Sequence, residues 1–392
     1  FTFTHAWFES VSGYTTTGSS ILTDIEALPA GLIFWRAATH WLGGMGIMLF
    51  VLAVLPSMGV AGMVLARSEM SVIAQENFRT SVKNTLRIIF TVYIGLTLLE
   101  TAALMICGMN LFDAVIHSFA TIATGGFSSK NASIAYFNSV PIELVIMLFM
   151  IFSGIHFGFI YSTFQKKEKL LCKSQIVKYY ITALALGIVI TSVNLYGDTF
   201  QSYSAALRYA SFQIISIGTS TGFATTDSSL WPAVSQLLLI FFALQCACAG
   251  STSGGIKADR MVMLGKAILR QIKLMQHPRA IFTVRIDGRS IAEDALALGI
   301  LFISAYLIVV FLTTLLLTVM GIDLLSAFSG AVAVTGNVGP GLGTVGSTGN
   351  FSHIPALGKW VLTAAMLLGR LEIYGLILFF HPQIWQTKQR AV

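Results

Sequence analysis

The chain has 392 residues, of which 55% are hydrophobic and only 10% are charged. Its mean hydropathy is +0.78, whereas soluble domains carry about 25% charged residues. This composition excludes an ordinary soluble domain and indicates an integral membrane protein.

Apolar stretches long enough to cross the roughly 30 Å hydrocarbon core of a bilayer, which takes about 20 helical residues, recur along the chain. In chain order they are Leu32–Leu55, Leu86–Cys107, Ile142–Phe164, Ile176–Tyr196, Val234–Ala249, Ile291–Met320 and Leu357–Phe380. The stretch from Val234 is shorter than the others because a glycine-rich sequence interrupts it. We therefore expect a multi-pass protein built mainly of membrane-spanning helices.

Four shorter segments of another kind lie before or between these spans. They read HAWFESVSGYTTTG from His5, DAVIHSFATIATGG from Asp113, YASFQIISIGTSTG from Tyr209 and SAFSGAVAVTGNVG from Ser326. In each, an apolar run of about twelve residues, too short to cross, leads into Thr, Ser and Gly residues. This pattern is typical of a half-length helix followed by an extended loop, which brings backbone carbonyls to a permeating ion.

The order of span, half-helix, loop and span predicts four repeats around one pore. The repeats cover residues 1–80, 81–173, 174–289 and 290–392. Each repeat returns the chain to the same side of the membrane, so the repeats are parallel and related by an axis along the membrane normal. The first repeat begins inside its half-helix, and we expect its preceding span to be missing. The predicted fold class is an all-α membrane protein with four pseudo-symmetric repeats.

Lysine and arginine residues gather on one side of this topology. Most of the 24 fall in four stretches: Arg67 to Arg87, Lys166 to Lys178, Lys257 to Arg289, and Lys388 with Arg390. By the positive-inside rule this side is cytoplasmic, so the net charge of +7 reflects topology and not a nucleic-acid partner. The four loops then open outward, within an acidic rim that would favour cations. The rim residues are Asp24, Glu26, Asp113, Asp198, Asp227 and Asp323.

The four loops have the composition of a cation filter. A dehydrated monovalent cation needs several preset oxygens, and carbonyls of an extended backbone supply them where glycine allows unusual dihedral angles. The half-helices also point their negative, C-terminal ends into the membrane, which favours a cation there. The candidate ion-binding residues are Thr16, Thr17, Gly18, Thr124, Gly125, Gly126, Ser220, Thr221, Gly222, Asn337, Val338 and Gly339.

A glycine-rich stretch and a lone arginine stand out within the apolar spans. The stretch Ala249–Ile256 reads AGSTSGGI, which cannot hold a helix in lipid and must be lined by protein or water. Arg370 lies in the last span, where a buried arginine costs at least about 2.5 kcal/mol and usually faces a water-filled cavity. Glu372 is two residues away and points to another helix face, so we expect Arg370 to face the pore. For Arg36 and Glu100 we expect packing near the membrane interfaces.

Eight motifs spread over nearly the whole chain are together highly specific. They are FESVSGYTTTGSS (Phe8–Ser20), WLGGMGI (Trp41–Ile47), HSFATIATGGFS (His117–Ser128), ISIGTSTGFATT (Ile215–Thr226), CAGSTSGGIK (Cys248–Lys257), HPRA (His277–Ala280), GNVGPGLG (Gly336–Gly343) and LLGRLEI (Leu367–Ile373). In these motifs the sequence resembles the Trk/Ktr/HKT superfamily of potassium transporters, and most closely its TrkH type.

The resemblance implies roles for these residues. It places K+ at the candidate ion-binding residues, with one filter glycine in each repeat, namely Gly18, Gly126, Gly222 and Gly339. It also implies a gate beneath the filter, formed by Gly250, Ser251, Thr252, Ser253, Gly254, Gly255 and the pore-lining Arg370. The implied partners are a second copy of the chain, the lipid of the bacterial cell (inner) membrane, and a cytosolic ring of RCK-type nucleotide-binding subunits like TrkA. No covalent cofactor and no nucleic acid are expected.

The sequence thus favours the ion-translocating subunit of a bacterial potassium uptake system. One alternative is a sodium-permeable or sodium-coupled relative of the same fold. Another is a secondary transporter of an organic solute, although the sequence shows no inverted symmetry. Channel-like flux and ion-coupled flux both stay open. An enzyme is not expected, because the seven histidines show no metal-ligand spacing and the chain has no nucleophile elbow.

Overall fold

The computed structural model describes residues 2–49, 82–166 and 173–373. In these ranges the chain is mainly helical, and its two strands, β1 (Arg285–Ile286) and β2 (Arg289–Ser290), pair as an antiparallel hairpin. The α-helices are α1 (Phe3–Tyr14), α2 (Ala30–Leu49), α6 (Val82–Ile106), α7 (Leu111–Ile122), α8 (Val140–Ser153), α9 (Phe157–Lys166), α11 (Gln175–Leu195), α12 (Tyr203–Gly218), α13 (Ala233–Gln245), α14 (Ala258–Gln276), α15 (Glu293–Val319), α16 (Leu324–Thr335) and α17 (Ala356–Arg370). Short 3-10 helices cover Ser133–Phe137, Ser228–Leu230 and Gly343–Val345.

Among the described residues, three helices are long and apolar enough to cross a membrane. They are α6 over Leu86–Ile106, α11 and α15, and the bent pair of α8 and α9 adds a fourth candidate. At 1.5 Å per residue, the 21 residues of α11 extend about 31 Å, which matches the hydrocarbon core. The predicted all-α membrane fold is confirmed in these segments.

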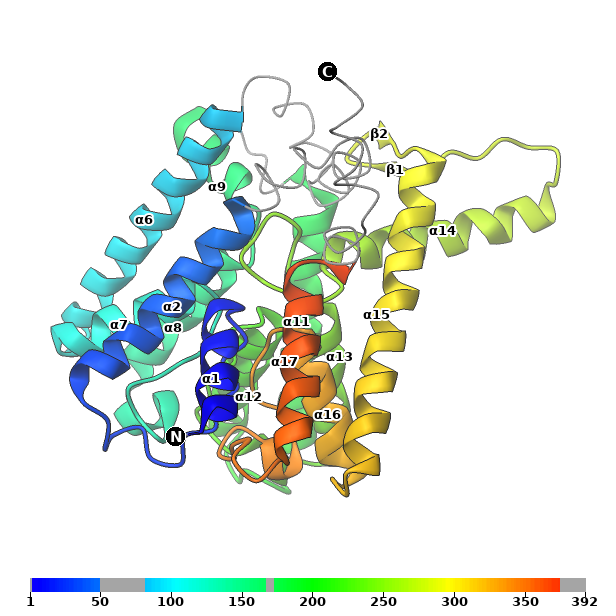
Figure 1. Ribbon diagram of the computed structural model, residues 1–392. Helices are drawn as coiled ribbons and strands as arrows, with labels where there is room; N and C mark the ends of the chain where they lie inside the picture. The colour runs from blue at the N-terminus through cyan, green and yellow to red at the C-terminus, as the bar shows by residue number, and fades with distance from the viewer. Residues whose placement is uncertain (1, 50–81, 167–172, 374–392) are drawn as a thin grey trace, which may run out of the picture.

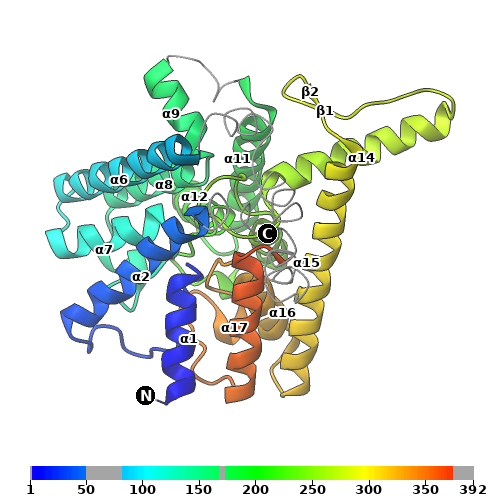
Figure 2. The same cartoon turned by 45° about the horizontal axis from the view of Figure 1, so that its top comes forward.

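The order of span, half-helix and span recurs along the chain. It appears as α6–α7–α8, α11–α12–α13 and α15–α16–α17, and α1 and α2 supply the last two parts of a further unit. In Figures 1 and 2, α6 and α15 lie on opposite sides of the molecule, with α1, α12 and α16 between them. The repeat boundary at residue 80 lies outside the described residues, and the boundaries at 173 and 289 remain predictions.

Buried tyrosines join one unit to the next. Tyr93 on α6 packs its hydroxyl against Gly44 on α2, and Tyr180 on α11 packs its hydroxyl against Gly154 at the end of α8. A methyl group added at either glycine would collide with that hydroxyl. Tyr306 on α15 is also fully buried. Small residues on one unit therefore accept large side chains from the next, which holds the units in close contact.

The predicted span Ile142–Phe164 is wrong as one continuous helix. The chain breaks between α8 and α9, whose axes differ by 102°. Backbone groups at the break pair with the glycine-rich stretch: the carbonyl of Gly154 accepts the N–H of Cys248 at 3.0 Å, and the N–H of Phe157 donates to Gly250 at 3.4 Å. The bend is stabilised because it satisfies polar groups of two interrupted helices at once.

Two further predicted spans end early. The helix in Val234–Ala249 stops before Cys246, which has a left-handed φ of 53°, and the helix in Leu357–Phe380 stops before Glu372, with a φ of 52°. A residue in that conformation cannot continue a right-handed helix. The parts of this last span after residue 373, and of Leu32–Leu55 after residue 49, lie outside the described residues.

Candidate ion pathway

The four half-helices end in the same unusual backbone conformation. Two residues before each loop glycine stands a residue with a side chain and a left-handed φ between 53° and 56°. These residues are Thr16, Thr124, Ser220 and Asn337. The loop glycines Gly18, Gly126, Gly222 and Gly339 are left-handed as well, with φ from 78° to 103°. Left-handed backbone is costly for residues with a side chain, so its recurrence at four matching positions marks four equivalent loops.

Hydrogen bonds explain why the chain adopts this conformation. The residue after each left-handed position donates its N–H to a carbonyl inside the half-helix, at 2.8–2.9 Å. The pairs are Thr17 with Ser12, Gly125 with Ala120, Thr221 with Ser216, and Val338 with Ala333. This is the Schellman arrangement, which satisfies carbonyls that the end of a helix leaves without a partner.

The four loops form a closed ring. A methyl group added at any loop glycine would strike the backbone carbonyl oxygen of a residue in another loop. The contacts, glycine first, are Gly18 with Gly125, Gly126 with Thr221, Gly222 with Val338, and Gly339 with Thr17. They pass from the first loop to the second, third and fourth and return to the first. Glycine is required at these positions by space as well as by φ.

The ring has the chemistry that a bare cation needs. The twelve residues that the sequence analysis assigned to ion binding all lie in these loops, and the polar side chains among them are fully buried. The carbonyl-rich, negative ends of α1, α7, α12 and α16 lead directly into the loops. Such an arrangement can replace the water of a monovalent cation with preset backbone oxygens.

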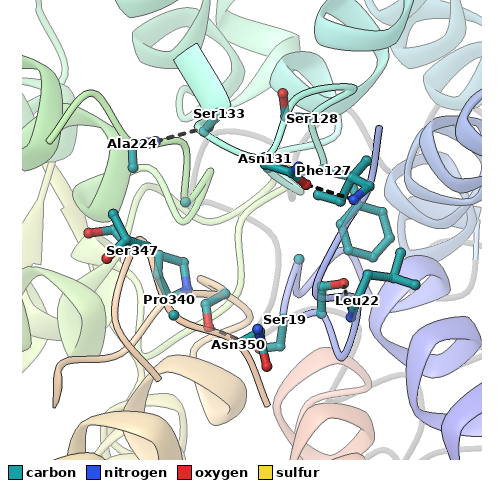
Figure 3. A pocket seen from close by; sticks show the side chains of 18 of the residues that line it. Ser19, Leu22, Phe127, Ser128, Asn131, Ser133, Ala224, Pro340, Ser347 and Asn350 are labelled. Carbon is teal, nitrogen blue, oxygen red and sulfur yellow. Dashed lines mark hydrogen bonds between the residues drawn. The ribbon is translucent and has the colours of Figure 1, made fainter. Parts of the chain in front are cut away.

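An open cavity of about 170 Å³ adjoins the ring, and all four loop glycines line it. Figure 3 shows polar side chains from different repeats around it. Those labelled there include Ser19, Ser128, Asn131, Ser347 and Asn350. A polar cavity beside a ring of carbonyls suits a hydrated ion before it loses its water.

Arg36 and Lys130 are the charged side chains that line this cavity, and its described lining contains no carboxylate. Two residues of the predicted acidic rim, Asp24 and Asp227, accept hydrogen bonds from side chains of that lining. Arg36, which we expected to pack near an interface, forms an ion pair with Glu9 at 2.7 Å. Asp323, expected in the rim, instead caps the start of α16.

His40 supports the first two loops from behind. Its Nδ1 lies 2.8 Å from the carbonyl oxygen of Gly13, and its ring centre lies 4.0 Å from that of Phe127. A methyl group at Gly125 would strike the imidazole, which is fully buried. Sequence reasoning missed His40, because a single histidine in an apolar segment carries no periodic signal.

The glycine-rich loop Ala249–Ile256 lies against the inner ends of the half-helices. Thr252 Oγ1 donates to the carbonyl of Ile122, the last residue of α7, at 2.9 Å. The N–H of Gly254 donates to Ser220 Oγ at 3.3 Å, and Gly254 also packs against the fourth loop. The open cavity lined by the four loop glycines lies on one side of the ring. The glycine-rich loop covers the other side of the ring, which we call its inner side.

Arg370 contacts the glycine-rich loop directly. Its Nη1 donates to the carbonyl of Thr252 at 2.5 Å, and its Nε and Nη2 have no hydrogen-bond partner among the described residues. Glu372 lies beyond the end of α17 and pairs instead with Lys257 at 2.7 Å and Arg260 at 2.8 Å. A buried guanidinium with free donors indicates a polar neighbour such as water in the pathway.

Comparison with known proteins identifies the family. The family model TrkH, described as a cation transport protein, matches residues 1–387. The chain belongs to the TrkH family. It is 37% identical over 388 residues to the Trk system potassium uptake protein TrkH of Escherichia coli K12, covering 98% of this chain and 80% of that protein. It is 32% identical over 389 residues to the Trk system potassium uptake protein TrkG of the same strain, with the same coverage.

A solved structure of the TrkH family supports the fold. The crystal structure of the potassium transporter TrkH from Vibrio parahaemolyticus matches with a TM-score of 0.86 and 34% identity, over 98% of this chain and 80% of that one. The resemblance noted from the motifs and the assignment as a multi-pass membrane transport protein are thereby confirmed.

Proposed function

We propose that this TrkH-family chain is the ion-translocating subunit of a bacterial potassium uptake system. In this proposal K+ passes through the ring of four loops after losing most of its water. The observation that carries the proposal is the closed set of glycine-to-carbonyl contacts, because it presets oxygens from four directions. The names of the relatives, which are potassium uptake proteins, support K+ as the ion.

Preset carbonyls favour K+ because they replace its hydration without rearranging. Schellman hydrogen bonds hold each loop to its own half-helix, and the glycine contacts hold it to its neighbour. Widening the ring would break these contacts, and narrowing it would push each loop glycine into the carbonyl of its neighbour. A smaller Na+ ion, which gains less from oxygens held at the distance that suits K+, is therefore conducted less well.

The gate in this proposal is the glycine-rich loop together with Arg370. The loop covers the inner side of the ring, and the guanidinium holds the carbonyl of Thr252 in that position. A fixed positive charge next to the pathway repels entering cations. Opening then requires that the loop and Arg370 separate.

The proposed assembly is a homodimer regulated by a cytosolic ring of RCK-type nucleotide-binding subunits. The Trk system names of the relatives support further components. The basic segments Lys166–Lys178 and Lys257–Arg289 would supply much of the docking surface, because complementary charge speeds association and fixes orientation. Residues 167–172 of the first segment lie outside the described residues.

Ion flux into liposomes tests the proposal. Purified protein should carry rubidium, a potassium substitute, faster than sodium, and an organic-solute transporter would carry neither in the absence of its solute. Replacing Gly222 with serine should lower the preference for rubidium over sodium by about tenfold, or about 1.4 kcal/mol, because the new side chain meets the Val338 carbonyl.

Gly108 provides the matched control for this substitution. It has a left-handed φ of 95°, but a side chain there meets nothing within 4 Å. Gly108→Ser therefore introduces the same backbone strain outside the ring and should leave the ion preference unchanged. Unaltered preference in Gly222→Ser, or sodium flux equal to rubidium flux in the unmodified protein, would contradict the proposal and favour the sodium-permeable alternative.

A further inference from the structure

Helix α14 leaves the helical bundle sideways. In Figures 1 and 2 it runs crosswise to α15, on the side of the molecule where the β1–β2 hairpin lies. After α14 the chain returns to the bundle through this hairpin and enters α15. The abundance of Lys and Arg in this region marks the cytoplasmic side. A helix lying crosswise at the end of a membrane-spanning bundle lies along the plane of the membrane.

One face of α14 is apolar and open. Ile268, Ile272 and Met275 are spaced by four and three residues, which places them on a single face of the helix. Their exposed fractions are 53%, 47% and 76%. Nothing in the described part of the protein covers this face. Three large hydrophobic side chains side by side along a helix are costly to leave in water.

The opposite face of α14 is basic and faces the returning chain. Lys266, Arg270 and Lys273 follow the same spacing of four and three residues, about half a turn from the apolar face. Lys266 donates to the carbonyl of Arg285, and Arg270 donates to the carbonyl of Phe282 at 2.7 Å. The returning segment thus lies over the basic face on the cytoplasmic side, and the apolar face is turned toward the membrane.

The crossing point with α15 sets the depth of α14. Met263 on α14 packs against Gly299 on α15. The charged first turn of α15, Glu293 and Asp294, marks where the chain enters the hydrocarbon. Gly299 lies six residues further along the helix, or about 9 Å deeper. This depth agrees with the roughly 5–10 Å at which in-plane amphipathic helices lie at the boundary of headgroups and acyl chains.

We propose that α14 is an in-plane membrane anchor that binds anionic phospholipid. Its apolar face enters the acyl boundary of the cytoplasmic leaflet. Lys273, which is exposed, contacts the negative headgroups. Because α14 follows the glycine-rich loop directly, the anchor also fixes the outer end of the segment that carries the proposed gate.

A depth measurement tests this anchor. The full chain, with Cys107 and Cys172 replaced by serine, receives Ile272→Cys or, as the control on the opposite face, Arg270→Cys. Each is labelled with a fluorophore and reconstituted into phosphatidylglycerol vesicles with nitroxide-labelled acyl chains. Quenching should be at least about threefold stronger for Ile272→Cys than for Arg270→Cys. In vesicles of phosphatidylcholine alone, this ratio should fall.

Each other outcome overturns part of the proposal. Equal quenching at the two positions shows that the apolar face does not enter the bilayer. Weak quenching together with rapid disulfide cross-linking of Met275→Cys assigns the face to a second copy of the chain. An equal ratio in both lipids removes the role of the anionic headgroup. None of these readouts depends on ion flux, so they are separate from the test of the proposed function.

Discussion

Asn337 differs from the residues that take its place in the other three loops. Like Thr16, Thr124 and Ser220 it has a left-handed φ, but asparagine tolerates that conformation better than threonine or serine. Its Nδ2 also donates to Thr17 Oγ1 at 2.9 Å and to the carbonyl of Met366 at 3.1 Å. Asn337 therefore connects the fourth loop to the first loop and to α17.

Replacing Asn337 with alanine should destabilise the protein by more than the cost of placing an alanine in left-handed backbone. Asn138 is the control, because it also has a left-handed φ, of 39°, but is exposed on the surface. The free energy of unfolding should fall by about 1–3 kcal/mol more in Asn337→Ala than in Asn138→Ala, since buried hydrogen bonds are lost. Denaturant unfolding in mixed micelles measures both, and equal losses would contradict the bonding role.

Asp323 should make the stability of the fourth half-helix depend on pH. Its carboxylate accepts the N–H of Ser326 at 3.0 Å, and chiefly this hydrogen bond holds its pKa below the usual value of 3.8. A lowered pKa means that the stabilisation is present at neutral pH and is lost as the pH falls below about 4. Asp323→Ala should cost about 1 kcal/mol at neutral pH.

The difference in melting temperature between the unmodified protein and Asp323→Ala should therefore shrink as the pH is lowered from 7 to about 3. Asp323→Asn keeps a capping oxygen without a titrating group and serves as the control. Its melting temperature should stay close to that of the unmodified protein at neutral pH. A difference that is constant over the whole pH range would show that the carboxylate does not contribute through its charge.

At the scale of the element, the sequence predicted the kinds of helix better than their ends. The half-helices and their loops were recognisable because a short apolar run closing on small polar residues is a local pattern. The bend between α8 and α9 was not recognised, since Ile142–Phe164 is apolar over most of its length. It depends on hydrogen bonds of Gly154 and Phe157 to a loop about ninety residues further along the chain. Pairing over such a distance leaves no mark in either segment alone.

The contact between α17 and the glycine-rich loop leads to a prediction about the gate. Arg370→Ala removes both the hydrogen bond to Thr252 and the positive charge, and shortening Gly250–Gly255 removes the cover itself. Both changes should raise the ion flux of the chain on its own, without the proposed regulatory partner, while the preference for rubidium over sodium persists. A buried hydrogen bond to a charged group is worth about 1.5–3 kcal/mol, so its loss should raise the ion flux by about tenfold or more.

The control for Arg370 is Arg208→Ala. Arg208 is ion-paired with Glu143 at 2.7 Å, and neither residue contacts the glycine-rich loop. Its replacement should leave flux in liposomes unchanged. Well-folded Arg370→Ala and loop-shortened proteins that conduct no more than the unmodified chain would place the gate elsewhere.

At the scale of the whole molecule, the sequence predicted the number of repeats but not how they meet. Spacing along the chain indicates four similar units, and it cannot say which carbonyl faces which glycine. The structure supplies that order, together with the close fit of Tyr93 on Gly44 and Tyr180 on Gly154. The positions of Arg36 and His40 also depend on contacts between units, which is why neither was assigned to the pathway beforehand.

The charge distribution over the whole molecule predicts how the proposed regulatory partner would bind. Arg279 and Arg285 are exposed on the chain that returns from α14. Replacing both with glutamine should weaken co-purification with a TrkA-like ring at raised salt, because screening leaves fewer charge contacts to hold it. Lys130→Gln, on the opposite side of the molecule, should not. If the double variant still binds the ring at raised salt, the two arginines contribute only to the orientation of the chain in the membrane.

The closed ring of contacts makes the width of the opening a property shared by all four loops. Each loop glycine touches a carbonyl of another loop, so displacing one loop pushes on its neighbour and, through it, on the rest. Substitutions at two of these glycines should therefore not act independently, as contacting residues rarely do. Once the first substitution has disturbed the contacts of the ring, the second has less left to disturb, so the combined effect is smaller than the sum of the two. The four loops differ in sequence but share one geometry, so each limits which substitutions the others can accept.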